Sequence, residues 1–90
     1  MFRYKSGIPL SYDRQGYIYF TSRLYKELSP KDQEKIRNLC CQSAGQHWRA
    51  VYMYVTTSAN ATWIEQNYHI SKAQLHRYVQ KYYMNFPKKL

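Results

Sequence analysis

Acidic side chains are scarce in this sequence, which has 5 Asp and Glu residues against 14 Lys and Arg residues. The formal net charge is therefore +9 on a chain of 90 residues. Such an excess indicates an acidic partner, most simply nucleic acid and less simply anionic lipid. A second interpretation is that the basic surface only keeps the protein in solution.

Long apolar runs are missing too. No stretch of about 18 apolar residues is present, so we expect no membrane-spanning helix and no membrane partner. The N-terminal segment "MFRYKSGIPLSYDRQGY" lacks the apolar region of a secretory signal, and we expect a cytoplasmic protein. The two cysteines, Cys40 and Cys41, are adjacent, which excludes a disulfide scaffold and favours two reduced thiols.

Patterns that carry catalysis or metal binding are also absent. No Asp or Glu is spaced so as to orient His47, His69 or His76 as a catalytic base. Cys40, Cys41 and His47 lack the separated cysteine pairs of a zinc site, and no glycine-rich phosphate loop occurs. We therefore expect no enzymatic activity, no cofactor and no bound metal.

Apolar residues make up 44% of the chain, which is enough for one core, and no linker or repeat divides it. We expect one all-α domain of four to five helices over residues 1–90. The turn-forming residues of "SGIPLSYDRQG" predict an irregular N-terminal arm over residues 1–16. Residues 17–28 begin with a strand-like alternation, but the helical spacing of their later apolar residues favours a helix. These later residues are Thr21, Leu24, Tyr25 and Leu28.

Capping residues predict where the helices begin and end in the rest of the chain. Ser29 and Pro30 predict a helix start, and Gly45 predicts its end. Asn60 can cap a short helix, and Ser71 with Gln74 forms the pattern of a capping box before a last helix. The expected inward positions, at helical spacing, are Ile36, Leu39, Cys40 and Ser43, then Trp48, Val51, Tyr52 and Val55, then Ala61, Ile64 and Tyr68, and finally Leu75, Tyr78, Val79 and Tyr82.

The outward face of the last helix is the most informative surface. From Ser71 to Leu90 the chain has 5 Lys or Arg residues and no acid, whereas an ordinary surface helix mixes signs. Lys72 and Arg77 suit phosphate or guanine, and Gln80 suits an adenine edge. The alternative is an ordinary solvated C-terminal helix.

The segment "AVYMYVTTSANATWIEQNYHISKAQLHRYVQKYY", residues 50–83, resembles the helix-turn-helix core of the stage III sporulation transcriptional regulator family. The strongest part is "YHISKAQLHRYV", with an apolar residue, a turn, Ser-Lys and a basic run. Similar short domains occur in regulators of phages and mobile elements. The sequence departs from the usual pattern at His69, where a turn glycine is common, and at Glu65, where alanine is common.

The resemblance implies that residues 46–83 form a DNA-binding helix-turn-helix with Lys72 to Tyr83 as its recognition helix. Trp63 would approach the DNA backbone or lie in the core, and the "MFRYK" arm would enter a minor groove or be frayed. A basic tail over residues 84–90 would meet phosphate. The DNA-binding residues expected from helical phase and resemblance are Thr62, Ser71, Lys72, Ala73, His76, Arg77, Gln80, Lys81, Lys88 and Lys89.

The function expected from these features is sequence-specific binding of double-stranded DNA by a transcriptional regulator of a bacterium, phage or mobile element. Residues 17–57 would form the scaffold and offer a surface for a homodimer. Two alternatives stay open. A protein-interaction module would expose Tyr17, Tyr19 and Phe20. A single-strand or RNA binder would stack bases on Tyr82, Tyr83 and Phe86.

Overall fold

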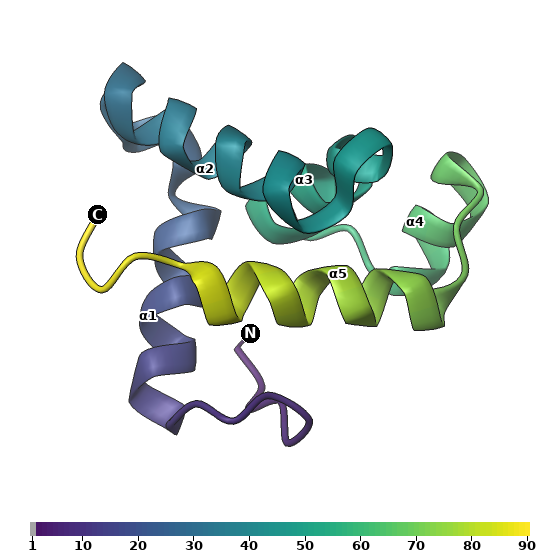
Figure 1. Cartoon of the computed structure of the whole chain (residues 1–90), viewed down its shortest axis with the longest axis horizontal. Helices are drawn as coiled ribbons and strands as arrows, with labels where there is room; N and C mark the ends of the chain where they lie inside the picture. The colour runs from purple at the N-terminus through teal and green to yellow at the C-terminus, as the bar shows by residue number, and fades with distance from the viewer. Residues whose placement is uncertain (1) are drawn as a thin grey trace.

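The computed structural model describes residues 2–90 and confirms the all-α prediction. Figure 1 shows α2 and α3 on one side of α5, α4 at the N-terminal end of α5, and α1 crossing near its C-terminal end. One hydrophobic core takes residues from all five of these helices. The helices are α1 (Tyr12–Arg23), α2 (Pro30–Ala44), α3 (Trp48–Thr56), α4 (Ala61–Tyr68) and α5 (Lys72–Asn85), and two short 3-10 turns span Tyr25–Glu27 and Gly45–His47.

The predicted caps at Ser29, Asn60 and Ser71 are confirmed. The Ser29 hydroxyl accepts the Asp32 N–H at 3.2 Å, and the Asn60 side chain accepts the Trp63 N–H at 2.8 Å. Each side chain satisfies a backbone donor that has no partner inside its helix. These caps fix where α2, α4 and α5 begin, and therefore which side chains of each helix face the core.

The first helix begins earlier and ends earlier than the sequence predicts. α1 starts at Tyr12, so the predicted irregular arm over residues 1–16 is too long, and it ends at Arg23 instead of continuing to residue 28. The physical reason for the early start is an N-cap that the apolar spacing does not reveal: the Ser11 hydroxyl accepts the Arg14 N–H at 3.1 Å. Its buried face is also different, because it consists of Gln15, Ile18 and Ser22.

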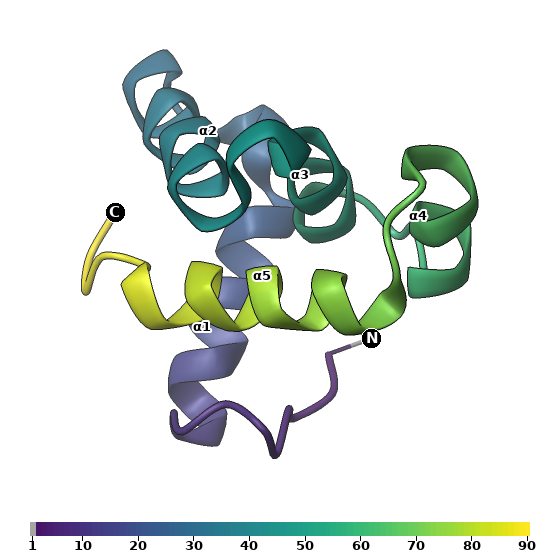
Figure 2. The same ribbon diagram turned by 45° about the vertical axis from the view of Figure 1, so that its right-hand side comes forward.

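The N-terminal arm is folded onto the domain, so a frayed terminus is the wrong prediction for residues 2–5, while Met1 lies outside the described residues. Phe2 and Ile8 are buried. Gln15, fully buried on α1, accepts the Lys5 N–H at 2.8 Å and donates to the carbonyls of Lys5, Ile8 and Leu10. Both ribbon views show the arm running below α5 to the start of α1 (Figure 2). The arm in this position leaves Arg3 and Tyr4 exposed, and a minor-groove contact by the arm stays a prediction.

The inward face of α5 matches the prediction at Leu75, Val79 and Tyr82, while Tyr78 is only half-buried. Tyr83 and Phe86 are buried as well, so none of the three rings proposed for base stacking is available to a single strand. The Tyr82 and Ser22 hydroxyls lie 2.7 Å apart. Burial raises the pKa of Tyr82 far above its ordinary value, so this phenol stays neutral.

One further boundary and one buried face need correction. α5 continues to Asn85, so the predicted tail over residues 84–90 begins two residues too early and the recognition helix is longer than residues 72–83. In α4, Ile64 is fully buried as predicted, whereas Ala61 and Tyr68 pack against the core only in part.

Candidate nucleic-acid interface

The turn between α4 and α5 consists of His69, Ile70 and Ser71. His69 has φ 57° and ψ 40°, in the left-handed region, and its N–H donates to the Glu65 carbonyl at 3.1 Å. This is the position where the helix-turn-helix pattern favours glycine, and histidine adopts it at a modest steric cost. Ile70 is buried and attaches the turn to the core. The tight turn predicted at "HIS" is therefore present, with the unusual backbone at His69.

The start of α5 is fixed by the capping box that the sequence predicts. The Ser71 hydroxyl accepts the Gln74 N–H at 3.1 Å, and the Gln74 side chain accepts the Ser71 N–H at 3.3 Å. No acidic residue lies in the first turn of this helix. The Ser71 cap takes the N–H of Gln74, so the N–H groups of Lys72 and Ala73 and the helix dipole are available to an anion.

The predicted reading residues on α5 are all exposed, and they alternate with the buried residues of the same helix. From the first to the last they extend about 14 Å along the helix axis, at 1.5 Å per residue. The one ion pair among residues 2–90 joins Lys35 to Asp32, so no carboxylate neutralises this face. The residues concerned are Lys72, Ala73, His76, Arg77, Gln80 and Lys81.

The predicted contacts on α4 also lie at the surface. Thr62 is exposed in the first turn of α4, one residue from the Asn60–Trp63 cap. The Trp63 side chain is 42% exposed and packs edge-on against Tyr68, so it does not lie in the core. Glu65 is partly exposed and has no ion pair within the described chain.

Lys88 and Lys89 are exposed, but the structure does not bring them near the start of α5. They lie beyond its C-terminal end, about 20 Å from the turn by helix rise. The tail is held there by Arg14 of α1, whose guanidinium donates to the carbonyls of Phe86, Pro87 and Lys88 at 3.2, 2.6 and 3.0 Å. No local sequence pattern signals a contact across 74 residues.

The N-terminal arm adds a basic border that the sequence did not predict. A cavity of about 270 Å³ lies between the arm and α5, with Lys5 on one side and His76 and Gln80 on the other. A second cavity, of about 230 Å³, is lined by Arg3, Lys5 and Arg23. Two of the predicted reading residues therefore face the arm as well as solvent.

The described chain offers few candidates for a metal site, a catalytic histidine or a reactive thiol. Within residues 2–90, no three His, Cys, Asp or Glu side chains gather as a metal site requires. His47 Nδ1 lies 3.0 Å from the Tyr78 hydroxyl and has no carboxylate partner. Burial raises the pKa of the Cys40 thiol to about 12, which leaves it unreactive at neutral pH, while Cys41 is exposed.

Comparison with known proteins gives no match: no family model, no curated protein and no solved structure matches this chain. Across residues 2–90, no helix has both the length and the apolar character needed to cross a membrane. The functional conclusion therefore depends on the fold and on the chemistry of α4, α5 and the arm.

Proposed function

We propose that this protein binds double-stranded DNA through α4, the His69–Ser71 turn and α5, and that it regulates transcription in a bacterium, phage or mobile element. One observation carries the proposal: the exposed face of α5 holds Lys72, Arg77 and Lys81 without any acidic residue. A basic helix face that has no acidic residue and that follows a tight interhelical turn is suited to bind the phosphate backbone of a duplex. The resemblance of residues 50–83 to sporulation regulators agrees with it.

The mechanism divides the exposed residues by their chemistry. Lys72 and Lys81, near the two ends of the face, neutralise phosphates and supply affinity that falls with salt. Arg77 lies between them, where a guanidinium can bond a guanine edge in two places, and Gln80 offers the matching geometry for adenine. The major groove is about 12 Å wide and admits a helix, and Ala73 leaves room for close approach of the α5 backbone.

The scaffold supports this mechanism by holding α5 in one orientation. Leu75 and Val79 are buried against the core, and the capping box fixes the helix start. A helix that is held at both ends loses little further entropy when it binds. At the other end, Arg14 bonds the tail carbonyls, so Lys88 and Lys89 meet phosphates only if the duplex extends past the end of α5.

A second candidate function, protein binding, is favoured by the exposed face of α1. Tyr12 and Phe20 of α1 are 61% and 54% exposed, Leu24 just past its end is 49% exposed, and Tyr17 is exposed as well. Several exposed apolar side chains on and just after one helix are typical of an interaction surface. The proposed occupant is a second copy of this chain, because two copies read two half-sites with higher affinity and specificity. Tyr19, also expected there, is half-buried and bonded to Arg23.

Selection of bound oligonucleotides from a random duplex pool tests the main proposal. We expect enrichment of one short motif, and competition by duplex stronger than by either single strand. Recovery of unenriched sequences, or equal competition by single strands, would contradict sequence-specific duplex binding. The length of the motif also reports on the second candidate, because a dimer selects two half-sites about one helical turn apart.

A further inference from the structure

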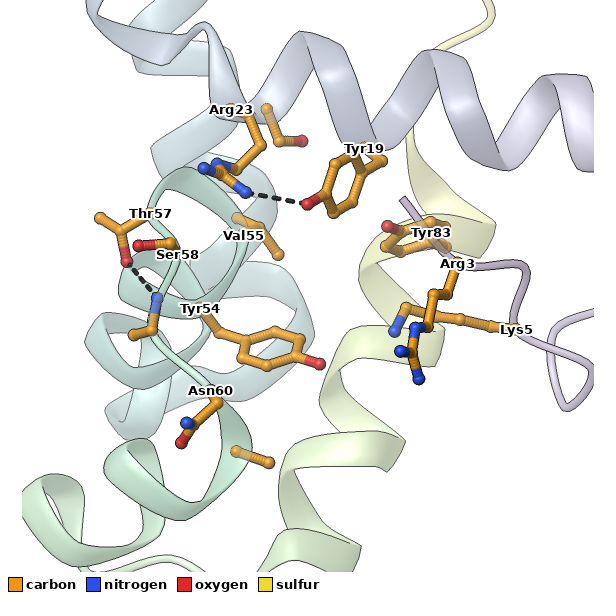
Figure 3. Close-up of a pocket in the computed structure, with 13 residues that line it drawn as sticks. Arg3, Lys5, Tyr19, Arg23, Tyr54, Val55, Thr57, Ser58, Asn60 and Tyr83 are labelled. Atoms are coloured by element: carbon orange, nitrogen blue, oxygen red, sulfur yellow. Dashed lines mark hydrogen bonds between the residues drawn. The ribbon is translucent and has the colours of Figure 1, made fainter. Parts of the chain in front are cut away.

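A cavity of about 230 Å³ opens between the N-terminal arm, α1 and the loop from α3 to α4 (Figure 3). Arg3 and Lys5 of the arm lie on one side of it, and Ser58 and Asn60 of the loop lie on the other. Arg23 of α1 is a third cation in its lining, and no Asp or Glu contributes to it.

Two of the three cations, Arg23 and Lys5, are held in place without being neutralised, and Arg3 is exposed at the border of the cavity. The Arg23 guanidinium donates to the Tyr19 hydroxyl at 2.8 Å and lies 5.6 Å from the centre of that ring. The Lys5 ammonium lies 5.7 Å from the centre of the Tyr54 ring, and the Lys5 backbone is bonded to buried Gln15. Aromatic faces attract cations but do not cancel their charge. No carboxylate lies within ion-pair distance of them in residues 2–90, so an anion in the cavity would meet three positive charges that no acidic side chain compensates.

The loop side of the cavity supplies further donors. Ser58 contributes a hydroxyl, and Ala61, the first residue of α4, brings the positive end of that helix to the lining. The cap N–H of Trp63 is already taken by Asn60, whereas the first helical N–H groups point out of the helix. The cavity lining thus combines two guanidinium groups, one ammonium, the Ser58 hydroxyl and the first residue of α4, with no acidic acceptor to repel an anion.

We propose that this cavity binds a phosphate group. A phosphate presents several acceptor oxygens around a compact negative charge, which matches a lining with cations from both the arm and α1. The volume of about 230 Å³ lies below the roughly 300–1,000 Å³ of pockets for drug-sized ligands, so at most a small group accompanies the phosphate. The phosphate comes either from a free phosphate monoester or from a DNA backbone that passes the start of α4. The second source rests on the proposed function, and the first does not.

The test uses the double variant Arg3→Gln/Arg23→Gln, with Arg49→Gln/Lys26→Gln as a control that removes the same charge from exposed positions outside the cavity. Inorganic phosphate is titrated against the full chain at constant ionic strength, and backbone amide shifts are followed by NMR. We expect saturable shifts at Ser58 to Ala61 in the wild type and the control, with at least tenfold weaker binding in the cavity variant. Circular dichroism and thermal melting check that both variants fold, and Lys5→Gln provides a third, milder removal of charge.

A duplex arm separates the two sources. If a backbone phosphate occupies the cavity, the cavity variant lowers the salt slope of duplex binding by about one to two units relative to the control, and free phosphate competes with duplex. If a free monoester is the ligand, duplex binding is the same in both variants while phosphate binding is lost in one. If the wild type binds phosphate but no duplex, the cavity proposal is supported and the proposed DNA-binding function is contradicted. Duplex binding equal in both variants, together with no phosphate-induced shift at Ser58 to Ala61, overturns the cavity proposal alone.

Discussion

α2 and α5 are built alike on the inside and differently on the outside. Each begins with a serine cap, at Ser29 and Ser71, and each buries one apolar face in the shared core. The exposed face of α2 mixes lysines with acids and forms an ion pair of 3.8 Å between Lys35 and Asp32. The charged residues on the exposed face of α5 are all cations.

The difference agrees with the proposal that a partner completes α5. Alternating signs let α2 gain a few tenths of a kcal/mol from neighbouring charges, and that helix needs nothing further. α5 lacks such pairs and accumulates repulsion among Lys72, Arg77 and Lys81, which the proposed polyanionic partner would relieve. Packing therefore explains why both helices form, whereas charge distinguishes the structural helix from the proposed reading helix.

The largest predicted effect concerns the buried apolar face, which α2 and α5 both have. Leu75→Ala should destabilise the domain by about 2–4 kcal/mol, and Val79→Ala by less, because each leaves a cavity in a packed core. Met84→Ala on the exposed side of the same helix should change the free energy of unfolding by less than about 0.5 kcal/mol. Chemical denaturation measures all three. Equal, small effects at Leu75 and Met84 would contradict the orientation of α5 described above.

The next largest effect is expected from substitutions on the exposed faces of α5 and α2. Arg77→Ala or Gln80→Ala should cost about 1–3 kcal/mol on the selected duplex and much less on scrambled duplex, because base contacts carry specificity. Lys35→Ala on α2 is the matched control and should leave both affinities unchanged. Binding curves on the two duplexes give the ratio directly. An unchanged ratio for Arg77→Ala and Gln80→Ala would show that α5 does not read bases.

Whether the sequence could predict a contact in this fold depends on how far apart its two residues lie along the chain. Ser71 with Gln74 is a local pattern, and the phase of α5 follows from it, which is why Leu75 and Val79 were placed correctly. Gln15 and Arg14 could not be assigned in the same way. Their partners lie in the arm and in the tail, up to 74 residues away, and a buried glutamine carries no periodic signal.

The basic cavity was missed for the same reason. Arg3, Lys5 and Arg23 are separated along the chain, and each alone resembles an ordinary surface cation. Only the folding of the arm onto α1, held by Gln15, brings them to one cavity. The tight turn at residues 69–71 followed from its length, whereas the left-handed backbone at His69 did not, because only the resemblance to a helix-turn-helix indicates a residue with positive φ there.

A smaller effect is predicted at the tail. Lys88→Ala should weaken binding to selected and scrambled duplex about equally and lower the salt slope by about one unit, because it removes a phosphate contact and no base contact. Titrations at several salt concentrations measure it. Since Arg14 fixes the tail at the far end of α5, an effect confined to duplexes long enough to reach that end is expected. No change in slope on a long duplex would remove Lys88 from the interface.

The smallest effect at neutral pH concerns the cysteines of α2. Burial raises the pKa of Cys40 from 9.0 to about 12, so in the unfolded chain this thiol ionises first. Its contribution to stability is fully present below pH 9 and is lost between about pH 9 and 12. Cys40→Ala should flatten the alkaline limb of the stability curve, whereas Cys41→Ala should not. A thiol reagent should modify Cys41 rapidly and Cys40 only on unfolding, and rapid modification of both would contradict the burial of Cys40.

The comparison of the two helices is tested most directly by the salt dependence of duplex binding in two charge-matched triple variants. One variant carries Lys72→Gln, Arg77→Gln and Lys81→Gln on α5, and the other carries Lys26→Gln, Lys31→Gln and Lys35→Gln on and just before α2. Wild-type log K should fall with log salt at a slope of about −4 to −5. The α5 variant should reduce that slope by about two to three units, while the α2 variant should keep it. Equal losses in both variants, or a wild-type slope near zero, would contradict the account of α5 as the DNA-binding helix.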